Sequence, residues 1–172
     1  MRRLGVVVAL SALLGMFGGV VTAGPALARG PKWQFAAAKP FTLSAAFCGF
    51  KIRVSFPVDK SFFKILKTSD GSTTFLSTGS VRVSFTNLAT GKTITENSSG
   101  PSKPTVFPDG SLTVTAGGHN GIFLTPADAQ RFGLPTVSVT VGRLTESVAA
   151  DGTITALSLH GHVAVDVCTA LS

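Results

Sequence analysis

The sequence contains no tyrosine, a single tryptophan and only two cysteines, although it contains thirteen phenylalanines. Protein interfaces and carbohydrate sites are usually rich in tyrosine and tryptophan, whose rings combine apolar contact with a hydrogen bond. The phenylalanines therefore predict core filling. We do not expect a sugar-stacking platform, because the only tryptophan is Trp33, close to the start of the mature chain.

Charged residues are sparse and unbalanced, with fifteen lysines and arginines against eight acidic residues and a net charge of +7 at pH 7. The basic residues never form a run and no aromatic platform accompanies them, so we expect no nucleic-acid partner. We interpret the surplus as solubilising charge on strand faces. An anionic wall polymer or membrane surface is the alternative partner.

Motifs of common enzyme classes are also absent. The sequence has no G-x-S-x-G elbow, phosphate-binding loop, H-E-x-x-H pair or calcium loop. Four of the eight acidic residues fall at turns or at a helix start, and Glu146 and Asp166 are the least explained of the others. A hydrolase built on paired carboxylates is therefore not favoured.

The chain opens with an export signal. Arg2 and Arg3 precede an apolar run over residues 4–21, and small side chains at Ala26 and Ala28 form a cleavage site. This pattern predicts a signal peptide over residues 1–28, with cleavage after Ala23 as the second choice. The arginine pair permits twin-arginine export, but the surrounding residues match that signal poorly, so the general secretory route is the default.

An uncleaved membrane anchor is the alternative, because the apolar run is long enough to nearly span a bilayer. Five glycines from Gly5 to Gly24 weaken this segment as a helix, and a cleavage site follows directly, so we favour cleavage. No second run of spanning length exists. The mature chain then comprises a flexible N-terminal arm, residues 29–40, and a single β-rich extracellular domain, residues 41–172. It is predicted to be secreted, and attachment to the cell surface stays open.

Two cysteines in an exported chain predict one disulfide, Cys48–Cys168. The bridge would close a loop of about 120 residues, join the first strand to the last, and add about 4 to 5 kcal/mol on the chain-entropy model. A nucleophilic thiol is the alternative. It is less favoured because residues 47–50, Phe-Cys-Gly-Phe, are typical of a packed apolar strand and no neighbouring base is evident.

Apolar and polar residues alternate with a period of two over residues 47–58, 81–86 and 137–141, as in half-buried strands. Residues 125–133 carry the only helical signal. The sequence therefore predicts an all-β fold, an antiparallel sandwich or barrel of about eight to ten short strands with one short connector helix. Glycines that permit tight hairpins lie between the runs, at Asp70-Gly71, Thr90-Gly91, Asp109-Gly110 and Asp151-Gly152.

The sequence allows one hypothetical metal site. His160 and His162 lie two apart in the last predicted strand, so both imidazoles can share a face with Asp166. With His119 from a glycine-rich loop, they would form a three-histidine site for a divalent metal. Exposed histidines on an edge strand explain the pair equally well, and we expect no cofactor. If Cys168 is buried, a β-bulge must intervene in this strand, and Gly161 is one place for it.

Several fragments together resemble a group of exported actinobacterial proteins of unknown function. The resemblance implies an extracellular protein with a β-fold, and it brings no activity or catalytic residue. The fragments are the hairpin turns, strand ends and cysteines Phe47-Cys48-Gly49-Phe50, Thr78-Gly79, Asn87 to Lys92, Asn97 to Pro101, Asp109-Gly110 and Asp166-Val167-Cys168.

Two functional hypotheses follow. The first is a non-enzymatic β-domain that binds an extracellular protein or a cell-wall polymer through loops at residues 97–104 and 117–121, since loops on a rigid scaffold commonly carry recognition. The second is a metal-assisted secreted enzyme or metal-binding protein that uses His160 and His162. A protease inhibitor or toxin-like effector leaves no sequence signature and stays open.

Overall fold

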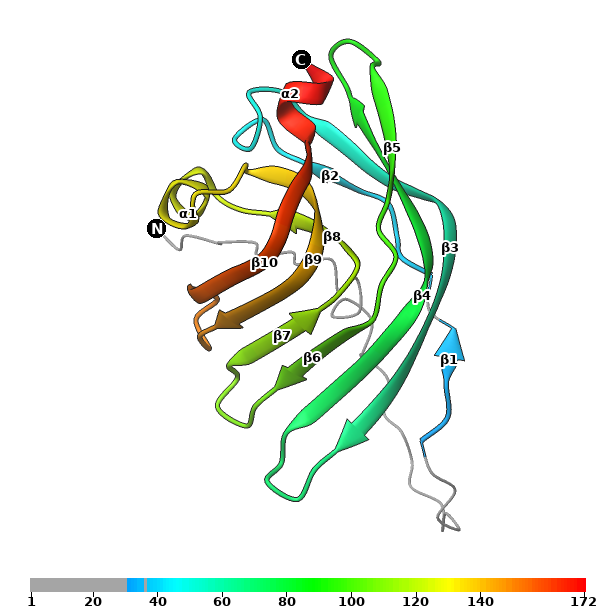
Figure 1. Cartoon of the computed structure of the whole chain (residues 1–172), viewed down its shortest axis with the longest axis vertical. Coiled ribbons are helices and arrows are strands. Elements are labelled where there is room, and N and C mark those ends of the chain that lie inside the picture. Colours follow the sequence, from blue (N-terminus) through cyan, green and yellow to red (C-terminus); the bar gives the residue numbers. More distant parts are fainter. Residues whose placement is uncertain (1–30, 36) are drawn as a thin grey trace.

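The computed structural model describes residues 31–35 and 37–172 (Figure 1). The predicted signal peptide lies outside these residues. No helix in the described part of the chain is long and apolar enough to cross a bilayer.

The fold is all-β, as predicted, with ten strands and two short helices. The elements in chain order are β1 (Gln34–Phe35), β2 (Phe41–Leu43), β3 (Ile52–Lys67), β4 (Thr73–Asn87), β5 (Thr93–Asn97), β6 (Ser102–Val106), β7 (Leu112–Ala116), β8 (His119–Phe123), α1 (Pro126–Phe132), β9 (Val137–Val148), β10 (Ile154–Asp166) and α2 (Val167–Leu171).

One antiparallel sheet runs through the molecule and divides along half of its length. In the undivided half, the strand order is β3-β4-β6-β7-β9-β10. In the divided half, β5 pairs with β4 and β8 pairs with β9, and the described residues show no ladder between β5 and β8. Figure 1 shows β5 and β8 diverging above the paired strands β6 and β7. The result is a sandwich at one end and a single curved sheet at the other.

The main core lies between the two parts of the divided half. Phe123 of β8 packs its ring 6.3 Å from Phe85 of β4 and 5.8 Å from Phe41 of β2. Helix α2 closes the end of this core with Val167 and Leu171, both fully buried. The buried cluster comprises Leu43, Ile52, Val54, Val83, Phe85, Phe123, Val137, Val139, Val167 and Leu171.

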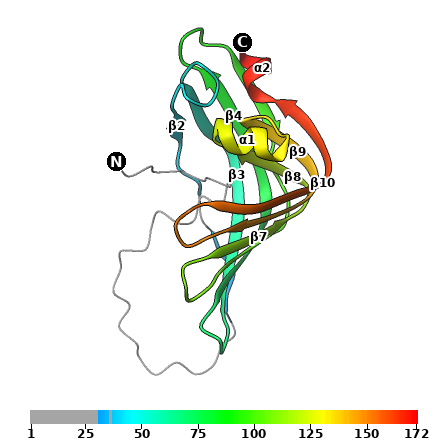
Figure 2. The ribbon, with the colours of Figure 1, turned by 90° about the vertical axis from the view of Figure 1, so that its left-hand side faces the viewer.

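A second apolar cluster lies under α1, on the opposite face of β9. Because side chains alternate along a strand, Val137 and Val139 of β9 enter the main core while Leu144 enters the second cluster. Figure 2 shows α1 in front of β8 and β9, on the side away from β3 and β4. Strand β9 is therefore covered on both faces, which explains why Ser138 and Thr140, between the core valines, are also fully buried.

A row of glycines marks the place where the sheet divides. Three of these glycines lie within strands, Gly79 in β4, Gly142 in β9 and Gly161 in β10. The others lie in the kinks between consecutive strands, Gly100 between β5 and β6, and Gly117 and Gly118 between β7 and β8. A Cβ on Gly100 would lie 1.8 Å from the carbonyl oxygen of Gly117, so the backbones meet more closely there than any side chain permits. We call this row, Gly79, Gly100, Gly117, Gly118, Gly142 and Gly161, the glycine crease.

The predicted turns and connector helix are confirmed. The glycines of all four hairpin dipeptides have positive φ angles between 77° and 86°. Thr125 caps α1 by accepting a hydrogen bond from the Asp128 amide, Pro126 occupies the first turn, and Gly133 ends the helix in the left-handed conformation.

Strand lengths and the strand ends near the cysteines differ from the prediction. Strands β3, β4, β9 and β10 have 12 to 16 residues each, whereas short strands were predicted. Cys48 lies in a turn and Cys168 lies in α2, so the prediction that the bridge joins the first strand to the last is wrong. A register shift falls between Val163 and Val165, not at Gly161, where Gly161 pairs directly with Gly142.

The segment predicted as a flexible arm is attached to the sheet at two points. Gln34–Phe35 pairs with Phe62 and Phe63 of β3, and the Ala38 amide donates to the Asp59 carboxylate at 2.6 Å. Strand β3 is a sheet edge, and its unpaired backbone groups can accept an added strand.

Candidate functional site

A cavity of about 120 Å³, partly open to solvent, lies at the glycine crease. The undivided sheet forms its apolar wall through Val114, Ala116 and Leu144, and β3 adds Phe56 and Phe63. The cavity therefore lies where the two halves of the sheet begin to separate and side chains no longer fill the space between them.

Both segments predicted as recognition loops line this cavity. Residues 97–104 contribute Ser98, Gly100, Pro101 and Ser102, and residues 117–121 contribute His119, Asn120 and Gly121. They are not projecting loops but kinks within two continuous strands, β5–β6 and β7–β8. Backbone hydrogen bonds hold the kinks together, from the Gly117 amide to the Pro101 oxygen at 2.9 Å and from the His119 amide to the Ser99 oxygen at 3.0 Å.

Hydroxyl groups and one carboxylate supply polar atoms to the cavity wall. The Ser77 and Ser102 hydroxyls lie 2.5 Å apart across the β4–β6 pairing, and Ser61 and Ser98 also line the wall. Asp59 accepts hydrogen bonds from the amides of Ala38 and Ser61, at 2.6 and 2.9 Å. Its carboxylate is thus held by backbone donors of the chain itself.

His119 and Asn120 complete the wall on the β8 side. The Nδ1 atom of His119 lies 3.3 Å from the side-chain nitrogen of Asn97. The Asn120 amide, which is buried, donates to the carbonyl oxygens of Gly118 and Gly142 and thereby joins the kink to β9. Serine, histidine and aspartate therefore line one cavity, but Asn97 and not Asp59 orients the histidine, so the arrangement differs from a nucleophilic triad.

Glu146 is a second unusual group, close to the cavity but beneath α1. Its side chain lies on the face of β9 that carries Leu144, it is 3% exposed, and Leu157 is among its apolar neighbours. Burial, together with the smaller effect of the negative charge of Asp128, raises the pKa of Glu146 to about 7. The glutamate that the sequence left unexplained is therefore a buried acid within a mostly apolar cluster.

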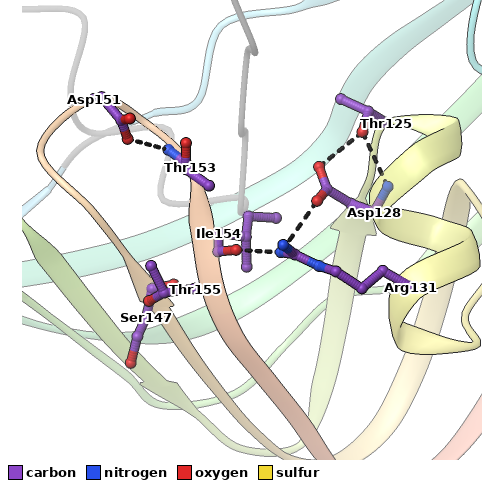
Figure 3. A network of polar contacts seen from close by, with 8 residues as sticks. All are labelled: Thr125, Asp128, Arg131, Ser147, Asp151, Thr153, Ile154 and Thr155. Atoms are coloured by element: carbon purple, nitrogen blue, oxygen red, sulfur yellow. Dashed lines mark hydrogen bonds and ion pairs between the residues drawn. The ribbon is translucent and has the colours of Figure 1, made fainter.

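Polar contacts fasten α1 to the sheet (Figure 3). Asp128 accepts a hydrogen bond from the Thr125 hydroxyl at 2.7 Å and pairs with Arg131 at 3.2 Å. Arg131 also donates to the carbonyl oxygen of Ile154 at the start of β10. Because the Asp128–Arg131 pair is the one ion pair found among the described residues, the charges on α1 neutralise each other, and Glu146 has no cationic partner there.

The structure separates the four residues of the predicted metal site. His119 of β8 and His162 of β10 both pair with Val141 of β9, from opposite sides of this strand. Their Cα atoms are therefore about two strand spacings, roughly 10 Å, apart. Asp166 caps α2 by accepting hydrogen bonds from the amide and hydroxyl of Thr169. Within residues 31–35 and 37–172, no group of three metal-ligating side chains lies close enough to hold an ion.

The predicted disulfide is present, with the Cα atoms of Cys48 and Cys168 5.2 Å apart and a sequence separation of 120 residues. The Thr136 hydroxyl lies 3.2 Å from the Cys168 sulfur and donates to the carbonyl oxygen of Phe47 at 2.7 Å. The bridge thus closes the divided half of the molecule. A disulfide of this kind fits an oxidising compartment.

Sequence reasoning identified the two kinked segments but missed most of the cavity wall. Nothing in the local pattern of Ser77, Ser102 or Ala116 distinguishes them from ordinary strand residues. The repeated glycines at mid-strand positions are the signal that could have indicated close backbone approach. Comparison of the chain with protein-family models, curated proteins and solved structures finds no match.

Proposed function

We propose that this protein is an exported, non-enzymatic binding protein that takes a small extracellular molecule into the cavity at the glycine crease. The cavity carries this proposal, because it unites the two segments expected to mediate recognition with apolar and hydroxyl-bearing walls. Ligand sites are typically concave, mostly apolar, and furnished with a few convergent polar groups.

The size and lining of the cavity favour one class of ligand. A cavity of roughly 150 Å³ accepts benzene, and this one, at about 120 Å³, is partly open to solvent. A single ring can enter against Val114 and Ala116 while a polar substituent stays near the Ser77 and Ser102 hydroxyls. We therefore propose a small ring-bearing molecule with one hydroxyl or comparable group.

Binding is favoured over acyl transfer by the way the polar side chains are used. Asp59 is engaged by two backbone amides, and His119 is oriented by Asn97. Hydrogen-bonding groups held in this way can orient a ligand without activating a nucleophile.

Titration with phenol, followed by NMR, tests the proposal. We expect saturable chemical-shift changes at the amides of Ser102, Ala116 and His119. The variant Ala116→Leu places three additional carbon atoms in the cavity, and it should weaken phenol binding by about tenfold or more, the difference expected when one apolar pocket is filled.

Ala89→Leu is the matched control, because Ala89 is exposed in the β4–β5 turn and the same atoms are added away from the cavity. It should bind phenol like the unchanged protein. Shifts that never saturate, or equal binding by the two leucine variants, would refute the proposed site.

A further inference from the structure

Strand β10 forms a long edge of the sheet. This 13-residue strand pairs with β9, and no second partner strand is found among the described residues. Natural edge strands are usually protected by lysine, proline or bulges. β10 contains no lysine, arginine or proline, and its register shifts lie near its two ends, between Ile154 and Ala156 and between Val163 and Val165. Residues 156–163 are therefore a regular, unguarded edge.

His160 and His162 lie in the regular part of this edge, on either side of Gly161. All three residues are exposed. In the ladder, His160 lies opposite Arg143 and His162 opposite Val141, so both histidines stand on one face of the sheet. One chain therefore supplies only two of the four ligands of a tetrahedral metal site, the imidazoles of His160 and His162. The positively charged guanidinium of Arg143 lies beside them.

The sequence His-Gly-His is self-complementary in an antiparallel pairing. If two copies pair edge to edge about Gly161, His160 lies directly opposite His162 of the partner subunit, and the converse pair is equivalent. Directly opposed side chains on one face have Cβ atoms roughly 4.5–5.5 Å apart. The four imidazoles would then surround one point above the seam between the copies.

We infer that β10 is a metal-completed dimer interface, in which His160 and His162 of two copies bind one divalent transition-metal ion such as Zn²⁺. Imidazole nitrogens suit zinc, copper and nickel, and four of them match the tetrahedral preference of zinc. An eight-residue strand pair covers less than the roughly 1,000 Å² of a stable interface. The metal is therefore required for pairing, and the site is incomplete in one copy.

Sedimentation velocity of the disulfide-bonded protein, with zinc chloride or with EDTA, tests this inference. We expect a monomer in EDTA and a dimer in zinc, with one zinc per two chains by metal analysis. A monomer at saturating zinc, a dimer that persists in EDTA, or one zinc per monomer would each overturn it.

Two variants distinguish dimerisation through His160 and His162 from general effects of zinc. The double variant His160→Ala, His162→Ala should stay monomeric at zinc concentrations that dimerise the unchanged protein. His119→Ala removes a histidine that lines the cavity, and it should dimerise normally. Because the His160 and His162 side chains are exposed, the double variant should keep the circular dichroism of the parent. Dimerisation of the double variant by zinc would refute the site.

Discussion

At the scale of single residues, Glu146 is the most unusual group in the protein. It is buried beside an apolar cluster that α1 covers, and the nearby charges on α1 pair with each other instead of with Glu146. Transfer of a carboxylate into such surroundings favours the neutral acid. Glu146 was noticeable in the sequence because no turn or helix cap explained it. Its burial could not be predicted, because it depends on how α1 packs on the sheet, and no local sequence pattern indicates that packing.

The glutamate makes stability depend on pH. Its pKa is about 7 in the folded protein against an ordinary 4.5. The folded state therefore binds more protons between these values, and the contribution of Glu146 to stability is greatest below pH 4.5 and is lost as pH rises to 7. The loss is about 3 kcal/mol. Glu146→Gln should remove this loss, so the variant should exceed the parent in stability at pH 8 by up to about 3 kcal/mol.

Urea unfolding at pH 4.5 and pH 8 measures the effect. Glu96→Gln makes the same chemical change at the other glutamate, and we expect its stability to follow that of the parent at both pH values. If Glu146→Gln and the parent lose stability equally between the two pH values, the pKa of Glu146 in the folded protein is not raised.

At the scale of elements, the glycine crease determines how four long strands cross from the undivided to the divided half of the sheet. Period-two alternation predicted the strand segments, and the dipeptides with glycine predicted every hairpin. The alternation could not show that short runs join into a strand of 15 residues such as β4, because a mid-strand glycine such as Gly79 resembles a strand end. Two glycines of the row, Gly100 and Gly161, leave the least room for a larger residue, because a Cβ there would lie 1.8 and 1.9 Å from a backbone carbonyl oxygen.

Gly100→Ala should destabilise the protein by about 3 kcal/mol, because its new methyl group would overlap the Gly117 carbonyl and separate the two kinks. Gly91→Ala is the control. Gly91 lies in the β4–β5 turn with a φ of 77° and open space around it, so alanine adds backbone strain of about 1 kcal/mol and no overlap. Thermal or urea unfolding of both variants makes the comparison, and equal losses would show that close approach at the crease contributes nothing.

At the scale of the whole molecule, one sheet forms both a sandwich and an open curved surface, and the cavity lies where the two meet. The fold class, the connector helix and the Cys48–Cys168 bridge were predictable from alternation, capping residues and the count of cysteines. The division of the sheet was not, since it depends on β4 pairing with β5 along one half and with β6 along the other. The cavity is a consequence of that pairing, so the sequence could not predict it either.

Native mass spectrometry of the protein collected from the medium of the producing cells tests the binding proposal most directly. We predict a small bound molecule on the parent protein and on Ala89→Leu, and its loss from Ala116→Leu, whose side chain fills the cavity. Bare protein in all three samples, or the same bound mass on Ala116→Leu, would contradict the account.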